Sequence, residues 1–287
     1  MTTFTRFLRS APLGVFGSTA QRVAELTDAD EALRAPTAIS RRIGFVQTGG
    51  GSGTSATAAY VASMLGRRRA GYVLGVDASA GNAGMLWHAG LPAGAEVAPS
   101  ARRASARRVD DAVDGLPRTS SGLWALDLGP LAVVPGPASA GLWYEECSPI
   151  TRFFDVVVTD WGVRTPRTDL ARVAEASHVV CLVARADRHA AEAATAAVEA
   201  LRGEEGVDVV VALVDVGGTA GRAPGIVAAG LDVPVVAIPY DAARGAKRPV
   251  PSENLATGTR IAYTRLATEL LRRALRPTVA PERTTAP

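Results

Sequence analysis

Residues 41–65 read RRIGFVQTGGGSGTSATAAYVASML, and this segment has three parts. The apolar run Ile43–Thr48 predicts a strand, the glycine-rich run 49–55 predicts a loop, and the alanine-rich residues from Ser55 onward predict a helix. Glycines allow backbone N–H groups to turn toward an anion, and the first turn of a helix adds partial positive charge. The segment therefore predicts a phosphate-binding loop. A tight turn that only needs a flexible backbone is the alternative reading.

Short β-branched runs alternate with alanine-rich helical patterns from Arg42 onward, which is typical of a parallel sheet with crossover helices. Several strands are apolar along their whole length, as strands covered on both faces are. We therefore expect one α/β domain with a doubly wound, mostly parallel sheet and helices on both faces. The expected strands are 43–48, 72–76, 131–134, 155–159, 179–183, 207–214 and 233–238, and the expected helices are 55–67, 167–175, 189–201, 220–229 and 254–275.

Two segments flank this domain, which we place over residues 41–276. Residues 1–40 are expected to form an N-terminal arm with a helix over Thr19–Arg34, which either packs on the domain or binds a partner. Residues 277–287 are rich in proline, threonine and alanine without periodicity, so we expect a disordered tail.

The composition describes a mildly basic globular chain with a net charge of +3, and it excludes a wholly disordered protein. Thirty of the 31 basic residues are arginine, and Lys247 is the single lysine. Cys147 and Cys181 have no metal-like spacing and fit a reducing compartment, so we expect a cytoplasmic protein. Glycines and prolines interrupt the most apolar region, residues 119–144, so no transmembrane segment is expected.

Three segments, in order along the chain, resemble the ParA/MinD family of ATPases with a deviant P-loop. The family loop reads K-G-G-x-G-K-[ST], and residues 49–55 align with its glycines at Gly50, Gly51 and Gly53. Asp77 matches the first residue of the family's D-x-D segment, and FDVVVTD, residues 154–160, matches its Walker B strand. The resemblance covers roughly residues 42–276.

This resemblance implies a site for ATP or ADP with Mg²⁺. Ser55 falls on the hydroxyl that binds the ion, Asp160 on the carboxylate that holds it through water, and Asp215 near the residue that recognises adenine. The alternative for Asp160 is a purely structural role, as an N-cap or turn carboxylate at a strand end. The residues implied around the phosphates are Gly50, Gly51, Ser52, Gly53, Thr54 and Ser55.

The departures from the family pattern bear on activity. Both loop lysines are replaced, by Gly49 and Thr54, and the loss of a charge-assisted contact to phosphate forfeits about 1.5–3 kcal/mol per hydrogen bond. Asp77 is the candidate catalytic residue, but Ser79 stands where the family has the second D-x-D aspartate. The family's T-P-P after Asp160 is replaced by residues 161–163, WGV.

We therefore expect a pseudo-ATPase rather than an ATPase: a non-hydrolysing or weakly ATP-binding scaffold with a protein partner, in positioning, partitioning or secretion machinery. One alternative is an active ATPase in which a partner, or Arg164, Arg167 or Arg185, supplies the missing charge. Another is an interaction module that binds no nucleotide. A dimer stays open, but not one built through the family's signature lysine.

A second basic feature is the run ARRASARR, residues 101–108, which is expected to be helical. It carries Arg102, Arg103, Arg107 and Arg108, and resemblance to ParA relatives raises non-specific DNA binding as a role. Asp110, Asp111 and Asp114 follow at once, so a solvated and internally paired helix is favoured over a DNA contact. The three histidines share no ligand spacing, so no metal other than Mg²⁺ is expected.

Overall fold

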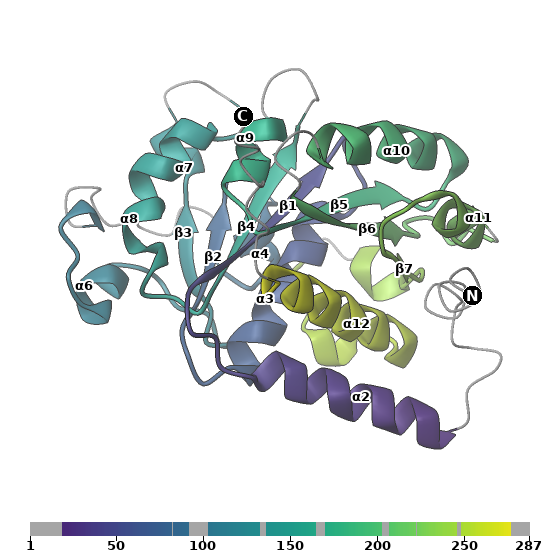
Figure 1. Cartoon of the computed structure of the whole chain (residues 1–287), viewed down its shortest axis with the longest axis horizontal. Coiled ribbons are helices and arrows are strands. Elements are labelled where there is room, and N and C mark those ends of the chain that lie inside the picture. Colours follow the sequence, from purple (N-terminus) through teal and green to yellow (C-terminus); the bar gives the residue numbers. More distant parts are fainter. Residues whose placement is uncertain are drawn as a thin grey trace, which may run out of the picture.

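The computed structural model describes residues 19–81, 83–91, 103–132, 136–164, 170–202, 207–221, 223–245 and 248–276. Seven strands form one sheet in the order β3-β2-β4-β1-β5-β6-β7, and every neighbouring pair is parallel (Figure 1). The expected doubly wound α/β fold is confirmed. The strands are β1 (Arg41–Gln47), β2 (Val73–Asp77), β3 (Trp124–Asp127), β4 (Val156–Val163), β5 (Val179–Arg185), β6 (Asp208–Val214) and β7 (Val235–Ile238).

Helices cover both faces of the sheet (Figure 1). One face is covered by α3 (Thr54–Arg68), α4 (Met85–His88) and α12 (Thr257–Ala274), with α2 (Thr19–Arg34) outside them. The opposite face is covered by α7 (Ala140–Glu146), α8 (Ser148–Thr151), α9 (Leu170–Glu175) and α10 (Arg188–Arg202). The remaining helices are α6 (Val109–Val113), α11 (Ala223–Gly230) and the 3₁₀ helices η1 (Gly129–Leu131), η2 (Ala242–Gly245) and η3 (Ser252–Asn254).

Alternation along the buried strands divides the core into two layers. In β4, Val156 and Val158 pack on the α3 and α12 side, whereas Val157 packs on the α7 to α10 side. Successive side chains of a strand point to opposite faces, so an entirely apolar strand supplies both layers. This double burial makes the sheet a rigid platform for the loops at its carboxyl edge.

The edge strand β3 corrects one expectation. A strand over residues 131–134 is wrong: Leu131 belongs to η1, and residues 133–135 lie outside the described part. The strand that forms is Trp124–Asp127, which pairs with Leu74–Asp77 of β2. It contains no β-branched residue, so the open edge of β2 decides its position rather than local propensity.

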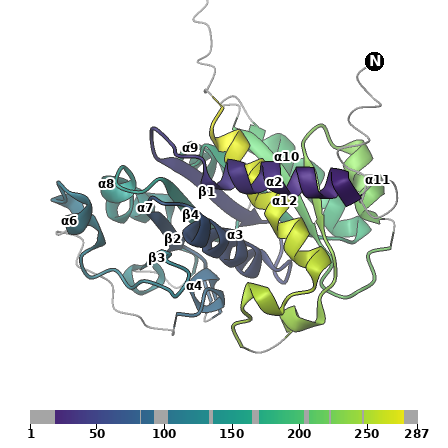
Figure 2. The same cartoon turned by 90° about the horizontal axis from the view of Figure 1, so that it is seen from below.

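Helix α2 has the expected bounds and lies against the domain. Figure 2 shows it crossing α12. Leu33 is buried in the core, and Glu25 forms an ion pair with Arg265 of α12 at 3.3 Å. Residues 1–18 of the expected arm and the expected disordered tail, 277–287, lie outside the described residues. Within the described part, each helix is either too short or too polar to cross a bilayer.

Candidate functional site

The glycine-rich loop connects β1 to α3 at the carboxyl edge of the sheet, where open α/β sheets bind their ligands. Gly51 (φ 76°) and Gly53 (φ 80°) adopt the left-handed conformation that side chains disfavour. Gly53 directly precedes α3, and its carbonyl accepts the N–H of Thr57 at 2.9 Å. The loop therefore leads straight into a helix N-terminus whose first N–H groups have no partner within the helix.

The interior of this loop is closed by neutral hydrogen bonds. The side-chain oxygen of Gln47, Oε1, accepts hydrogen bonds from the hydroxyls of Ser52 and Thr54, the latter at 2.8 Å. The two hydroxyl oxygens lie 3.1 Å apart. Both hydroxyl residues are buried. Thr54, at the position of the family's second loop lysine, thus fixes the loop without supplying a charge. Sequence reasoning missed Gln47, although a polar side chain at the end of a buried strand was a signal.

A row of three carboxylates crosses neighbouring strands at the same edge. The parallel register places Asp77 of β2 opposite both Asp127 of β3 and Asp160 of β4. Sequence reasoning did not single out Asp127, because its place in the row depends on the pairing of β3.

Asp160 is completely buried. Its Oδ1 accepts the N–H of Gly162 at 3.0 Å, whereas its Oδ2 is a buried oxygen without a hydrogen-bond partner. Burial, and after it the charge of Asp77, raises the pKa of Asp160 to about 7, against a smaller opposing effect of the Ser55 hydroxyl. A carboxylate that only shapes a turn would have both oxygens hydrogen-bonded within its loop, whereas only Oδ1 of Asp160 is bonded there.

Both carboxylate oxygens of Asp77 accept hydrogen bonds, in contrast to those of Asp160. Its Oδ1 accepts the N–H (3.1 Å) and the hydroxyl (2.6 Å) of Ser79, and its Oδ2 accepts the N–H of Leu86 at 3.3 Å. A Cβ at Gly84 would lie 2.0 Å from Oδ2, so glycine is needed there. Burial raises the pKa of Asp77, and the hydrogen bonds from Ser79 and Leu86 oppose that rise. The carboxylate is thereby anchored to its own loop, and a catalytic role for it stays a prediction.

The residues at this edge fit Mg²⁺. Asp160 offers an unpartnered buried oxygen, and the Ser55 hydroxyl at the start of α3 interacts with the same carboxyl group. Hydroxyl and carboxylate oxygens are ligands that Mg²⁺ prefers, and the ion usually completes its shell with water and phosphate. No group of three or more His, Cys, Asp or Glu side chains in the described ranges could hold a metal by itself.

The arginines considered as substitutes for lysine have other contacts. Arg164 is buried and donates to the carbonyls of Trp161 (2.8 Å), Ala138 (2.7 Å) and Ala78 (3.3 Å). Its guanidinium also lies 5.3 Å from the Trp161 ring centre. This arginine therefore joins the ends of β2 and β4. Arg185 is half exposed and pairs with Asp187 at 3.1 Å, and Arg167 lies outside the described residues, as does Lys247.

Asp215 shapes the loop after β6. Its Oδ1 accepts the N–H groups of Gly217 (3.1 Å), Gly218 (2.7 Å) and Thr219 (3.2 Å), and its Oδ2 accepts that of Ala220 at 3.3 Å. The carboxylate caps its own loop, which sequence reasoning did not foresee. Recognition of adenine by Asp215 stays a prediction.

The basic run 101–108 is not one exposed helix. Arg103 is buried and forms an ion pair with Glu146, with Nε and Oε2 3.1 Å apart. Arg107 and Arg108 precede α6, and their backbone N–H groups both donate to Asp111 at 3.0 Å. Arg103 and Ala104 are helical, but residues 105–108 are not, so a helix over the whole run is wrong. Arg102 lies outside the described residues.

Comparison with known proteins gives structural relatives only. No protein-family model matches the chain, and no curated protein sequence matches it significantly. A ParA family ATPase from Chlorobium tepidum is similar in structure, with a TM-score of 0.58, 17% identity, and coverage of 79% of this chain and 98% of that one. The septum site-determining protein MinD with Mg-ADP from Pyrococcus horikoshii has a TM-score of 0.57 at 18% identity, covering 80% of this chain and 96% of that one.

An enzyme is also among the similar structures. Cobyrinic acid a,c-diamide synthase from Mycobacterium smegmatis, with bound ADP and magnesium, gives a TM-score of 0.52 at 18% identity, covering 84% of this chain and all of that one. At such identities the likeness shows the fold, and one fold hosts different chemistries. This chain thus has the fold of the ParA and MinD ATPases.

Proposed function

We propose that the chain is a ParA/MinD-like protein with a degenerate nucleotide site. It binds ATP or ADP with Mg²⁺ weakly, has little or no ATPase activity, and serves as a cytoplasmic scaffold for a protein partner in positioning, partitioning or secretion machinery. The observation that carries this proposal is the closed loop interior, where Thr54 is buried and bonded to Gln47 at the place of a lysine.

Nucleotide binding is supported by the groups that remain. The N–H groups of residues 50–54 would contact the phosphates, while the Ser55 hydroxyl and the free oxygen of Asp160 would hold Mg²⁺. Bound Mg²⁺ supplies positive charge that offsets the phosphates. Two similar structures, MinD and the diamide synthase, contain ADP with magnesium.

Low turnover is supported by the groups that are absent from the loop. Phosphoryl transfer is accelerated mainly by positioning and electrostatic stabilisation, and the loop has Gly49 and the neutral hydroxyl of Thr54 where the family has two ammonium groups. The hydroxyl of Ser79, in place of the second D-x-D aspartate, donates to Asp77, so it offers no base to an attacking water. Arg164 is held by backbone carbonyls rather than by the loop.

The test combines calorimetry of the full chain with ATP and Mg²⁺ and an ATPase assay with and without DNA. We expect a measurable but weak affinity and no turnover above background. The variant Gly50→Asp is the control for the site, because a side chain at Gly50 meets no atom within 4 Å and its carboxylate would repel phosphate.

Two results would overturn parts of the proposal. Turnover that is lost in Asp160→Ala would make the protein an active ATPase. No heat at millimolar ATP, or heat that Gly50→Asp leaves unchanged, would show that the loop binds no nucleotide.

A further inference from the structure

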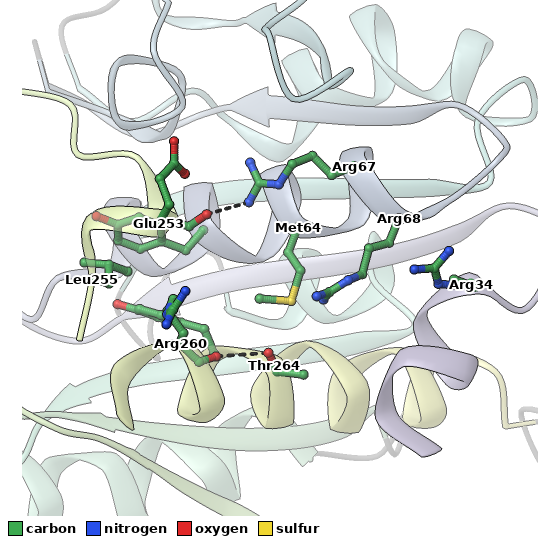
Figure 3. Close-up of a pocket in the computed structure, with 11 residues that line it drawn as sticks. Arg34, Met64, Arg67, Arg68, Glu253, Leu255, Arg260 and Thr264 are labelled. Atoms are coloured by element: carbon green, nitrogen blue, oxygen red, sulfur yellow. Dashed lines mark hydrogen bonds between the residues drawn. The ribbon is translucent and has the colours of Figure 1, made fainter. Parts of the chain in front are cut away.

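A second feature with the character of a binding site is a cavity of about 400 Å³ between α3 and α12 (Figure 3). Its apolar lining comes from Tyr60 and Met64 of α3 and from Leu255 and Tyr263. Ser252 and Glu253 of η3 and Arg34 of α2 complete its wall. None of the lining residues belongs to the glycine-rich loop, so this cavity is separate from the candidate nucleotide site.

Four arginines surround the cavity, and they outnumber the acidic groups near them. Arg34 and Arg68 share one carboxylate, that of Asp30, at 2.6 and 3.0 Å from their Nε atoms. The other acid of the lining is Glu253. The other two arginines of the lining are Arg67 and Arg260. Four guanidinium groups therefore face two carboxylates, those of Asp30 and Glu253.

Among the described residues, the side chains of Arg67 and Arg260 donate hydrogen bonds to hydroxyl groups. Arg67 donates to Ser252 Oγ at 2.8 Å, and Arg260 donates to Thr257 Oγ1 at 3.2 Å. No carboxylate in the described part of the chain forms an ion pair with either guanidinium. Figure 3 shows them on the two helices that form opposite walls. Each therefore keeps donors for a further anionic partner.

The environment of Arg68 points the same way. Its Nη1 is a buried nitrogen without a hydrogen-bond partner, and Figure 3 shows its guanidinium between the helices, near Met64. An unpaired buried donor of a charged group is costly, and an anion in the cavity would remove that cost. Burial also lowers the pKa of Arg67, and the charge of Glu253 opposes this shift without forming an ion pair.

We propose that this cavity binds a small polyanion, a molecule with two or more phosphate groups, held by Arg67, Arg68 and Arg260. Guanidinium groups match phosphate oxygens in pairs, and three of them line this cavity from two helices. A small ligand is favoured over an acidic peptide because the cavity has the volume of a small-molecule site.

The test uses the full chain and inorganic triphosphate in buffer without Mg²⁺, followed by calorimetry and thermal melting. We expect binding with a dissociation constant below about 1 mM and a rise in melting temperature, since a ligand that binds only the folded state stabilises it. The double variant Arg67→Gln/Arg260→Gln should weaken binding at least about tenfold. Glu253→Gln should tighten it, and added salt should weaken it.

Two controls make the result decisive. Arg272→Gln removes an exposed arginine from the same helix, α12, outside the cavity, and should leave the affinity unchanged. Gly50→Asp blocks the glycine-rich loop and should also leave it unchanged. The proposal is wrong if triphosphate does not bind at 1 mM, if Arg272→Gln weakens binding as much as the double variant, or if Gly50→Asp abolishes binding that the double variant keeps.

Discussion

At the residue scale, the chemistry of the loop depends on Thr54 and Asp160. Thr54 is 2% exposed, and its hydroxyl holds the loop closed through Gln47. Asp160 is fully buried, and one of its oxygens has no hydrogen-bond partner, which is unfavourable although the charge of Arg164 offsets part of the burial. Thr54 therefore fixes the loop but supplies no charge, whereas Asp160 keeps an oxygen without a hydrogen-bond partner that suits a cation.

Thr54→Lys restores a cation to the loop. We expect Mg-ATP to bind about one to two powers of ten more tightly, because an ammonium group would form charge-assisted hydrogen bonds with phosphate. Calorimetry measures the affinity, and Thr54→Met, similar in size and neutral, is the control that should show no gain. Circular dichroism of both variants checks the fold. An unchanged affinity in a folded Thr54→Lys protein would mean that the loop is only a turn.

Asp160→Asn removes a buried charge next to Asp77. At pH 8 without Mg²⁺, we expect the free energy of unfolding to rise by about 1–2 kcal/mol, since burial of an unpaired carboxylate is unfavourable. Any stabilisation by Mg²⁺ with ATP should disappear in the same variant. Urea denaturation measures both effects. Asp28→Asn, at an exposed position of α2, should change neither. Destabilisation by Asp160→Asn would contradict this account of the site.

At the element scale, side chains complete contacts that the strands and helices leave open. His178 lies just before β5, and its ring Nδ1 accepts the backbone N–H of Arg42 at 2.9 Å. The backbone N–H of His178 donates to the Arg42 carbonyl, also at 2.9 Å. The imidazole thereby extends the contact between β1 and β5 beyond the strand ladder. Helix α2 is held similarly, since Arg69, directly after α3, donates from Nη1 to the Leu33 carbonyl at 3.1 Å.

His178 makes the stability depend on pH. Burial, and then the charges of Arg42 and Arg41, lowers the pKa of His178 from 6.5 to about 4. Between pH 6.5 and 4 the unfolded chain therefore binds a proton at this residue that the folded chain does not. Its contribution to stability is fully present above pH 6.5 and declines as the pH falls toward 4.

His178→Asn keeps an acceptor for the Arg42 N–H and removes the titration. We expect the melting temperature of this variant to fall less between pH 6.5 and 4.5 than that of the unaltered protein. Thermal melts across this range measure the difference. His189→Asn, at an exposed position of α10, should leave the slope unchanged. Equal slopes in all three proteins would refute the role given to His178.

At the scale of the whole molecule, α3 connects the two candidate anion sites. It begins at the glycine-rich loop and contributes Tyr60, Met64, Arg67 and Arg68 to the cavity. The rings of Tyr60 and Tyr263 lie 4.9 Å apart in the cavity lining and join α3 to α12. A ligand in the cavity would therefore stabilise the packing of the same helix that follows the loop.

The mass of the protein in solution should not respond to nucleotide. The position of the family's signature lysine is Gly49, so a dimer held by that lysine across the phosphates cannot form. We expect analytical ultracentrifugation to give the same mass with and without ATP and Mg²⁺. A doubling of the mass on addition of ATP would contradict this, and Gly50→Asp would show whether such a dimer needs the loop.

Much of the fold was predictable because its signals are local. The glycines of residues 49–53 and the valine runs of β4 and β6 specify a loop and buried strands within a few residues. The contacts that sequence reasoning missed are long-range. Arg103 and Glu146 lie 43 positions apart, and Arg42 and His178 lie 136 apart. A short strand such as β3 has no strong local pattern, so its place depends on the free edge of β2.

The sequence by itself determined the α/β alternation, the phosphate-loop position and the absence of lysine from it, since these follow from residue type and local order. Only the tertiary structure decided that Gln47 closes the loop, that Asp160 keeps a free oxygen and that Arg164 is bound to carbonyls. It also brought four arginines together around one cavity. The physical reason is that hydrogen bonding and burial depend on neighbours from distant segments, which meet only when the sheet and its helices are assembled.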